Sequence, residues 1–533
     1  MPEPSPADHP NLRSDLRKVT RNTALRVVGT GASGVGRLAL TVVVTRMLGT
    51  SGAGAFFSGL AIFTLVSIVC ELGADTGFVR GIPRSRALGR TAEVRRSLVV
   101  GIVPVFVLSS AFAIALVAFA EPLTRAISGG AGSAEVLAYV RTLSPFLPLS
   151  AVSTVILAAT IGYGTMVPTV VVDNVGKPLV RPVLAAIVIA AGAGATALAL
   201  SWALPIVVGL GIAAAFLLTM TRRAETLDLG PAAEPVRGYR ELGGEFWRFS
   251  APRAMAGALE GLLVRLDILL VGGLATTAIA GIYAASSRLL ALGSFVLGAV
   301  ITAISPQISL ALATEDHDRA EALYQTCTWW LMIPSWPIYL LLAIYAPLVL
   351  RVLGPQFVRG DLVLELLSTA MLVMMATGPV TSVLLMGGFS VWNLVNSVIG
   401  MASMVGLNML LVPRYGLTGA AIAGSVTIVA VQLAAALEVW VLLRLEPLGR
   451  GFRTVAVSSL VSVGVPGLLA RAAFGTTIPA LAVTLVVAVP AYLLLLRRAA
   501  DELRFAMLRE AIRRERGGLR LVDEVVAREA VAP

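Results

Sequence analysis

The sequence predicts an all-α integral membrane protein of about fourteen transmembrane helices, arranged as two six-helix lobes followed by two extra helices. Three observations predict this class: the composition, the spacing of the apolar segments and an internal repeat. Of the 533 residues, 57% are hydrophobic and only 14% are charged, and the mean hydropathy is +0.86. Soluble proteins carry about 25% charged residues. The chain is therefore too apolar for a soluble multidomain protein.

The apolar segments have the length that a membrane-crossing helix needs, ~20 mostly apolar residues. The predicted spans are 24–47, 54–79, 97–120, 138–161, 168–191, 195–219, 248–272, 276–304, 325–348, 361–386, 390–412, 417–443, 454–473 and 478–496.

The positive charges indicate how the helices are oriented. The formal net charge is +11, and lysine occurs only at Lys18 and Lys177. Arginines gather in segments 80–96, 220–247 and 444–453 and after residue 496, all on one side if the spans alternate. The positive-inside rule then predicts a multi-pass protein of a bacterial-type plasma (inner) membrane with both termini in the cytoplasm. Nucleic-acid binding would need a soluble basic domain, and the sequence contains none.

Short segments recur in order at an offset of roughly 225 residues, as expected for repeated halves of a transporter. The pairs are 192–201 with 416–425, 53–56 with 280–283, and 162–163 with 388–389. Because six helices is an even number, both halves would have the same orientation, related by an axis along the membrane normal.

The repeat divides the chain into six parts. We predict a cytoplasmic N-terminal segment (1–23), an N-lobe (24–219), a cytoplasmic linker (220–247), a C-lobe (248–443), two extra helices (444–496) and a basic cytoplasmic tail (497–533). Within the tail, residues 501–516 have helical amphipathic spacing, which predicts a helix lying on anionic membrane lipids.

Four ionisable residues fall near the middle of predicted spans. At 1.5 Å per residue, Arg37, Arg181 and Glu260 lie ~18–20 Å from the inner ends of their spans, and Arg288 lies ~18 Å from the outer end of its span. Intramembrane charges are rare and tend to face a cavity or mark a pathway. Two interpretations are open: a shared central cavity, or separate structural pairs such as Arg288 with Glu260.

Other charges suit a gate or an ion-coupling role. Asp173 and Lys177 are four residues apart and can also form a local helix pair near the interface. Arg265 and Asp267 fit an outer gate or simply the interface. The full set of gate or coupling candidates is Asp173, Lys177, Glu71, Asp75, Arg80, Arg253 and Asp267.

The sign of the midplane charges indicates the substrate. Arginines in a low-dielectric cavity need an anion, and the guanidinium fork matches phosphate oxygens bidentately. A lipid-linked pyrophosphate sugar fits this chemistry, with its head group in the cavity and its lipid tail outside. An exporter of cationic drugs should instead carry mainly carboxylates at the midplane.

Catalytic and metal chemistry are not predicted. Cys70 and Cys327 lie in apolar runs, and His9 and His317 are isolated, so no metal-ligand spacing occurs and no cofactor is expected. A polytopic glycosyltransferase or polymerase would need a large outer loop with catalytic residues, whereas segments 121–137 and 349–360 are short. We find no nucleophile motif and do not expect an enzyme.

The stretch LGTSGAGAFFSGLAIFTLVSIVCELGADTGFVRGIPR resembles the start of polysaccharide flippases of the multidrug/oligosaccharidyl-lipid/polysaccharide (MOP) superfamily. Similar stretches are FWRFSAPRAMAG, GIYAASSRLL and LVPRYGLTGAAIAGS, so the resemblance covers nearly the whole chain. The residues that carry the first match are Leu48, Gly49, Gly52, Gly54, Phe56, Glu71, Leu72, Gly73, Gly77 and Arg80.

The resemblance implies a two-lobed, V-shaped fold of fourteen helices that works by alternating access. It implies flipping of polyprenyl-diphosphate-linked oligosaccharide from the inner to the outer leaflet, for cell-surface polysaccharide biosynthesis. Two alternatives stay open: a lipid II flippase for peptidoglycan, and a cation-coupled multidrug exporter of the same fold. Coupling to Na⁺ or H⁺ is also open, with Glu260 or Asp173 as candidates.

Overall fold

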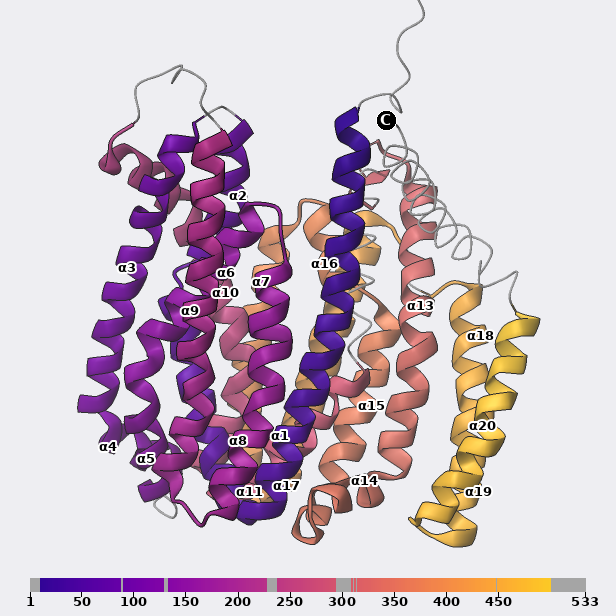
Figure 1. The fold of residues 1–533 in the computed structure, drawn as a ribbon. Coiled ribbons are helices and arrows are strands. Elements are labelled where there is room, and N and C mark those ends of the chain that lie inside the picture. The colour runs from indigo at the N-terminus through magenta and orange to yellow at the C-terminus, as the bar shows by residue number, and fades with distance from the viewer. Residues whose placement is uncertain are drawn as a thin grey trace, which may run out of the picture.

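The computed structural model describes residues 10–87, 90–128, 133–227, 237–293, 308–309, 311–312, 314–446 and 448–499. These residues form a bundle of long helices running roughly side by side (Figure 1). They contain no β-strand, so the predicted all-α class is confirmed. The N-terminal residues 1–9, part of the predicted linker (228–236) and the predicted tail helix (501–516) lie outside the described residues.

The first half of the chain contributes α1 (Pro10–Cys70), α2 (Ala74–Ala87), α3 (Thr91–Ala118), α4 (Ala120–Ser128), α5 (Ser133–Leu143), α6 (Leu147–Gly162), α7 (Val167–Thr169), the π-helix η3 (Val170–Gly176), α8 (Lys177–Ala190) and α9 (Ala195–Leu227). The second half contributes α10 (Tyr239–Leu274), α11 (Thr277–Leu289), α13 (His317–Ile344), α14 (Ala346–Leu353), α15 (Asp361–Thr377), α16 (Val380–Met386), α17 (Ser390–Leu443), α18 (Arg450–Ser459), α19 (Val465–Phe474) and α20 (Ile478–Arg498). The short elements η2 (Ser144–Phe146), η4 (Pro355–Gly360) and η5 (Leu460–Gly464) connect neighbouring helices.

Two helices are far longer than one membrane crossing and change direction at a glycine. The 61-residue α1 bends at Gly49, where φ is +69°, and the 54-residue α17 bends at Gly416, where φ is +55°. Glycine adopts this left-handed region freely because it has no Cβ. Each bend lies in a gap between two spans that the sequence predicted separately, so the two long helices each hold two predicted spans.

Nine helical segments within the described residues are long and apolar enough to cross a membrane. Helix α10 is not among them because charged residues such as Arg265 and Asp267 interrupt its apolar sequence. Helix α11 belongs to a shorter apolar segment, Thr277–Gly293. The chain is thus a multi-pass membrane protein, while the count of fourteen spans stays a prediction.

The repeated segments around Gly54 and Gly281 pack against one another. A Cβ on Gly54 would lie 1.7 Å from the Thr277 carbonyl oxygen, and a Cβ on Gly281 would lie 2.2 Å from the Thr50 carbonyl oxygen. Thr50 and Thr277 are separated by the same offset as the glycines, so the contact is reciprocal. A pseudo-two-fold axis through this point would produce such a contact, although the division into lobes stays a prediction.

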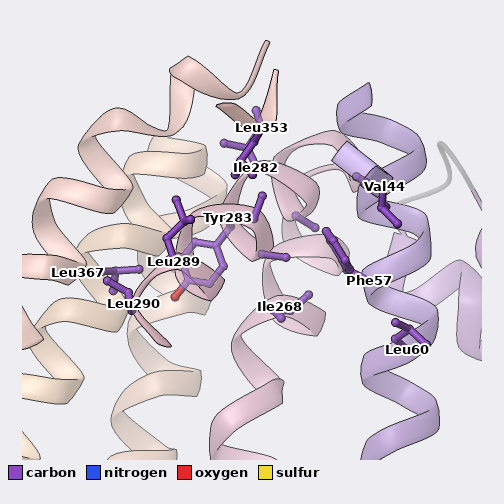
Figure 2. Close-up of a cluster of buried hydrophobic side chains, with 14 of the residues drawn as sticks. Val44, Phe57, Leu60, Ile268, Ile282, Tyr283, Leu289, Leu290, Leu353 and Leu367 are labelled. Carbon is purple, nitrogen blue, oxygen red and sulfur yellow. The ribbon is translucent and has the colours of Figure 1, made fainter. Parts of the chain in front are cut away.

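Next to this glycine contact lies the main hydrophobic core. Figure 2 shows Phe57 pointing from α1 towards α11, with Ile268 of α10 below and Tyr283 of α11 beside it. Phe57 and Tyr283 are buried, as are the other labelled side chains. The core therefore fixes α1, α10 and α11 together, and these helices carry most of the candidate site.

The last helices, α18 to α20, stand at one edge of the bundle (Figure 1). The buried Tyr345 hydroxyl lies 2.6 Å from Thr484 Oγ1 and 3.1 Å from the Ala480 carbonyl oxygen of α20. Arg471 of α19 pairs with Glu365 of α15 at 3.0 Å. Polar contacts as well as apolar packing therefore attach the extra helices.

We expect Gly54→Ala to destabilise the protein, because the added methyl cannot fit against the Thr277 carbonyl without moving α1 away from α11. Overpacking of this kind costs about 1–3 kcal/mol. Thermal unfolding of the purified protein should show a lower Tm. The matched control is Gly211→Ala in α9, where a Cβ meets nothing within 4 Å; equal melting of Gly54→Ala and wild type would contradict the close contact.

Candidate functional site

Four arginines from four helices converge inside the bundle. Arg37 comes from α1, Arg181 from α8, Arg265 from α10 and Arg288 from α11. Arg37 lies within electrostatic range of the other three, and Arg288 is also within range of Arg265. The sequence analysis singled out three of these as binding residues. The structure adds Arg265, and we call the four residues the arginine cluster.

Aromatic rings hold two members of the arginine cluster in place. The Arg181 guanidinium carbon lies 3.7 Å from the centre of the Trp202 ring, and Arg181 Nε donates to the Trp202 carbonyl oxygen at 3.1 Å. The Arg288 guanidinium carbon lies 3.9 Å from the centre of the Phe57 ring. Stacking of this kind attracts the cation to the ring face without neutralising its charge.

Among the described side chains, no carboxylate lies within ion-pair distance of the arginine cluster. Asp173 is near enough to Arg181 to attract it, and Glu71 and Asp267 likewise attract Arg265, but only at longer range. Arg37 is exposed, and the other three arginines are half-buried. The cluster is therefore a partly accessible set of like charges, whose mutual repulsion an anion would relieve.

A close helix contact brings α1 to α8 at the level of the cluster. A Cβ on Gly36 would lie 2.3 Å from the Pro178 carbonyl oxygen, so only glycine permits this approach. Just before α8, residues 170–176 form a π-helix. Such segments are uncommon and often occur at functional sites. The contact between Gly36 and Pro178 places Arg37, the next residue along α1, close to Arg181.

The predicted pair of Asp173 and Lys177 is present. Lys177 Nζ lies 2.7 Å from Asp173 Oδ1 and 3.4 Å from Ser153 Oγ of α6. Only 11% of the Lys177 side chain is exposed, compared with 32% for Asp173. The pair is therefore a local neutralised unit beside the arginine cluster.

A second group of charges lies where α1 ends and α2 begins. Glu71 is within electrostatic range of Asp75, Asp173 and Arg265 and interacts with the Thr154 hydroxyl. Helix α1 ends here because Leu72 and Gly73, the residues that follow it, both have positive φ. Asp75 lies in the first turn of α2, where the helix dipole favours a negative charge.

The remaining predicted residues fall in different places. Asp267 accepts the Ile268 backbone N–H at 2.7 Å and lies beside the Tyr283 hydroxyl. Arg80 stacks on Phe249 and belongs to a separate pocket at the end of the bundle. Glu260 and Arg253 are on α10, but their side chains lie outside the described residues, so neither is placed in the cluster.

Metal-ligating side chains do not gather in the described part of the chain: no group of three or more His, Cys, Asp or Glu residues there could hold an ion. Cys70 and Cys327 are both buried and unpaired with one another.

The fold is that of MOP-superfamily transporters. It is similar to lipid II flippase MurJ in an inward closed conformation, with TM-score 0.67 and 13% identity over 89% of this chain and 98% of that one. It is also similar to an inward-facing multidrug resistance MATE family transporter (TM-score 0.64, 17% identity, 77% and 94% of the two chains). A third similar structure is a MOP superfamily transporter from Pyrococcus furiosus, described as having a binding pocket of reversed polarity (TM-score 0.53, 15% identity, 81% and 96%).

The family follows from the sequence itself. Residues 43–359, more than half of the chain, match the family model described as polysaccharide biosynthesis protein. The chain belongs to this family. No curated protein matches it. The protein is therefore a member of the polysaccharide biosynthesis family with the fold of MOP-superfamily transporters, as the sequence predicted.

We expect Gly36→Ala to separate α1 from α8 and to shift Arg37 relative to Arg181, because the methyl would overlap the Pro178 carbonyl. The cost should be about 1–3 kcal/mol, seen as a lower Tm. Gly31→Ala, five residues earlier in α1 and facing open space, serves as the control. Equal Tm values for the two variants would argue against the close contact.

Proposed function

We propose that this protein flips polyprenyl-diphosphate-linked oligosaccharide from the inner to the outer leaflet by alternating access, for cell-surface polysaccharide biosynthesis. The observation that carries this proposal is the arginine cluster, with four cations from α1, α8, α10 and α11 and no carboxylate in ion-pair contact among the described side chains. We propose Arg37, Arg181, Arg288 and Arg265 as the residues that bind the substrate. Glu260 remains a proposed member of this set on the sequence alone.

The chemistry of a pyrophosphate suits this cluster. A diphosphate diester offers several anionic oxygens in a small volume, and each guanidinium can donate two parallel hydrogen bonds to such oxygens. Because Arg181 and Arg288 are stacked on rings, less side-chain freedom is lost when they bind. Arg37, which is exposed, would make the first contact with an entering head group.

The family supports a role in polysaccharide production, and the similar structures support a transporter that changes conformation. Their names include an inward closed and an inward-facing state. In our proposal the predicted lobes, 24–219 and 248–443, move against each other around the Gly54–Gly281 contact, and the oligosaccharide passes through the space between them while the lipid tail stays in the bilayer.

Lipid II carries the same diphosphate and is the alternative substrate, named in one of the similar structures. The charge balance favours either lipid over a cationic drug, since the cluster would repel a cation. A coupling ion, Na⁺ or H⁺, would act at the carboxylates beside the cluster. We propose Glu71, Asp75 and Asp173 for this role, because Glu71 lies within electrostatic range of the other two carboxylates and of Arg265, and Asp173 pairs with Lys177.

Arg181→Ala should strongly weaken binding of the pyrophosphate lipid. A ligand that binds only the folded state raises its apparent stability, so the lipid-linked oligosaccharide should raise the Tm of wild type and of Arg351→Ala, an exposed arginine outside the cluster, but not of Arg181→Ala. Loss of two charge-assisted hydrogen bonds predicts binding weaker by about 3 kcal/mol. A Tm rise with a lipophilic cation instead, equal in wild type and Arg181→Ala, would overturn the flippase proposal.

Glu71→Gln should separate binding from coupling. The neutral isostere leaves the arginine cluster intact, so the Tm rise with lipid-linked oligosaccharide should persist. Flipping in proteoliposomes should lose its dependence on an imposed Na⁺ or H⁺ gradient. The control is Glu365→Gln, since Glu365 pairs with Arg471 away from the cluster. Full gradient dependence in Glu71→Gln would remove Glu71 from the coupling set.

A further inference from the structure

A second basic site lies at the end of the bundle where α2, α3 and the start of α10 meet. It is a pocket of about 420 Å³, and none of its lining residues belongs to the arginine cluster. Its charged lining residues are Arg80, Arg84, Arg90, Arg237, Arg248 and Glu245. The hydroxyl-bearing residues Ser85 and Ser97 complete the polar part of the lining.

Some arginines of this pocket are in ion pairs and others are not. Arg237 pairs with Glu93 at 2.8 Å and with Glu245 at 2.7 Å, and Arg84 pairs with Glu245 at 2.9 Å. The hydrogen bond from Arg237 lowers the pKa of the Glu245 carboxyl from its ordinary value, so Glu245 is anionic at neutral pH. Two further arginines of the lining, Arg80 and Arg248, have no carboxylate within ion-pair distance among the described side chains.

The shape of the pocket leaves room for a ligand. A Cβ on Gly81, which lines the pocket, would meet nothing within 4 Å. Arg80 lies over the Phe249 ring, with 4.1 Å between the guanidinium carbon and the ring centre. Arg80 and Arg248 are both exposed, so an anion can reach them without breaking the ion pairs of Arg84 and Arg237.

The surroundings of the pocket favour a lipid over a free anion. Val79 and Phe249 next to Arg80 are 40% and 38% exposed, so an apolar surface continues from the mouth of the pocket. The distribution of arginines predicts that this end faces the cytoplasmic leaflet, which carries anionic lipids. Basic pockets between helices on that side bind phosphate-bearing head groups.

We propose that this pocket binds the phosphate of an anionic phospholipid head group, with the acyl chains lying along Val79 and Phe249. Arg80 of α2 and Arg248 of α10, which both line the pocket, hold the phosphate. A bound head group therefore joins α2 to α10 and stabilises the arrangement in which these two helices are in contact. The site is separate from the arginine cluster, and its test does not depend on the transported substrate.

Binding of a fluorescent phosphatidylglycerol to the purified full-length protein tests the proposal, with phosphatidylcholine as the zwitterionic competitor of zero net charge and inorganic phosphate as the free anion. Wild type should bind phosphatidylglycerol, and neither competitor should displace it at equal concentration. Arg80→Gln with Arg248→Gln should weaken binding about thirtyfold, since two basic side chains near an anionic head group are lost. Arg95→Gln with Arg222→Gln, which removes two exposed arginines outside the pocket, should bind as wild type does.

A steric variant keeps the test independent of charge and folding. Gly81→Leu fills the open space but removes no arginine, and it should also weaken phosphatidylglycerol binding while leaving the Tm of the lipid-free protein near that of wild type. Equal binding in wild type, Gly81→Leu and the Arg80→Gln/Arg248→Gln variant would overturn the proposal. Full displacement by inorganic phosphate would overturn the lipid assignment and leave a free-phosphate site. Arg181→Ala should bind phosphatidylglycerol normally, which separates this site from the transport site.

Discussion

Repulsion among four arginines inside a membrane protein is the constraint on which the rest of the site depends. Bringing cations together in a low dielectric is unfavourable unless something compensates. Here the compensation is partial: Trp202 and Phe57 offer ring faces, and Asp173, Glu71 and Asp267 attract from a distance. The close contacts at Gly36 and in the core of α1, α10 and α11 supply the packing that holds the charges together against this repulsion.

The two basic sites use arginine in opposite ways. In the pocket at the start of α10, Arg237 forms an ion pair with Glu93 of α3, and Arg84 of α2 forms one with Glu245 of α10. The exposed Arg80 and Arg248 are available to a ligand. In the arginine cluster, every member lacks a carboxylate in contact among the described side chains. The first arrangement stabilises a fixed structure, whereas the second leaves positive charges without a contacting carboxylate, and in our proposal these charges bind the substrate.

Much of the fold could be predicted from the sequence, because membrane-crossing helices require long apolar segments and glycine marks the sharp bends at Gly49 and Gly416. The candidate site was harder to predict from the sequence. Arg265 was interpreted as a gate or interface residue because depth was counted along a straight helix, which says nothing about the direction of the side chain. The aromatic partners Trp202 and Phe57 could not be identified either, since they come from helices whose neighbours depend on tertiary packing.

The π-helical turn before α8 has a consequence for insertions and deletions. A π-helical turn holds about one residue more than an α-helical turn. The segment 170–176 therefore contains one residue more than an α-helix of the same length would hold. Elsewhere in this span, losing one residue would rotate everything beyond it by about 100° and carry Arg181 away from its partners. If the lost residue lies within 170–176, the segment can become a regular α-helix, and the helix beyond it keeps its rotation. A one-residue deletion within 170–176 would therefore leave the direction of Arg181 unchanged.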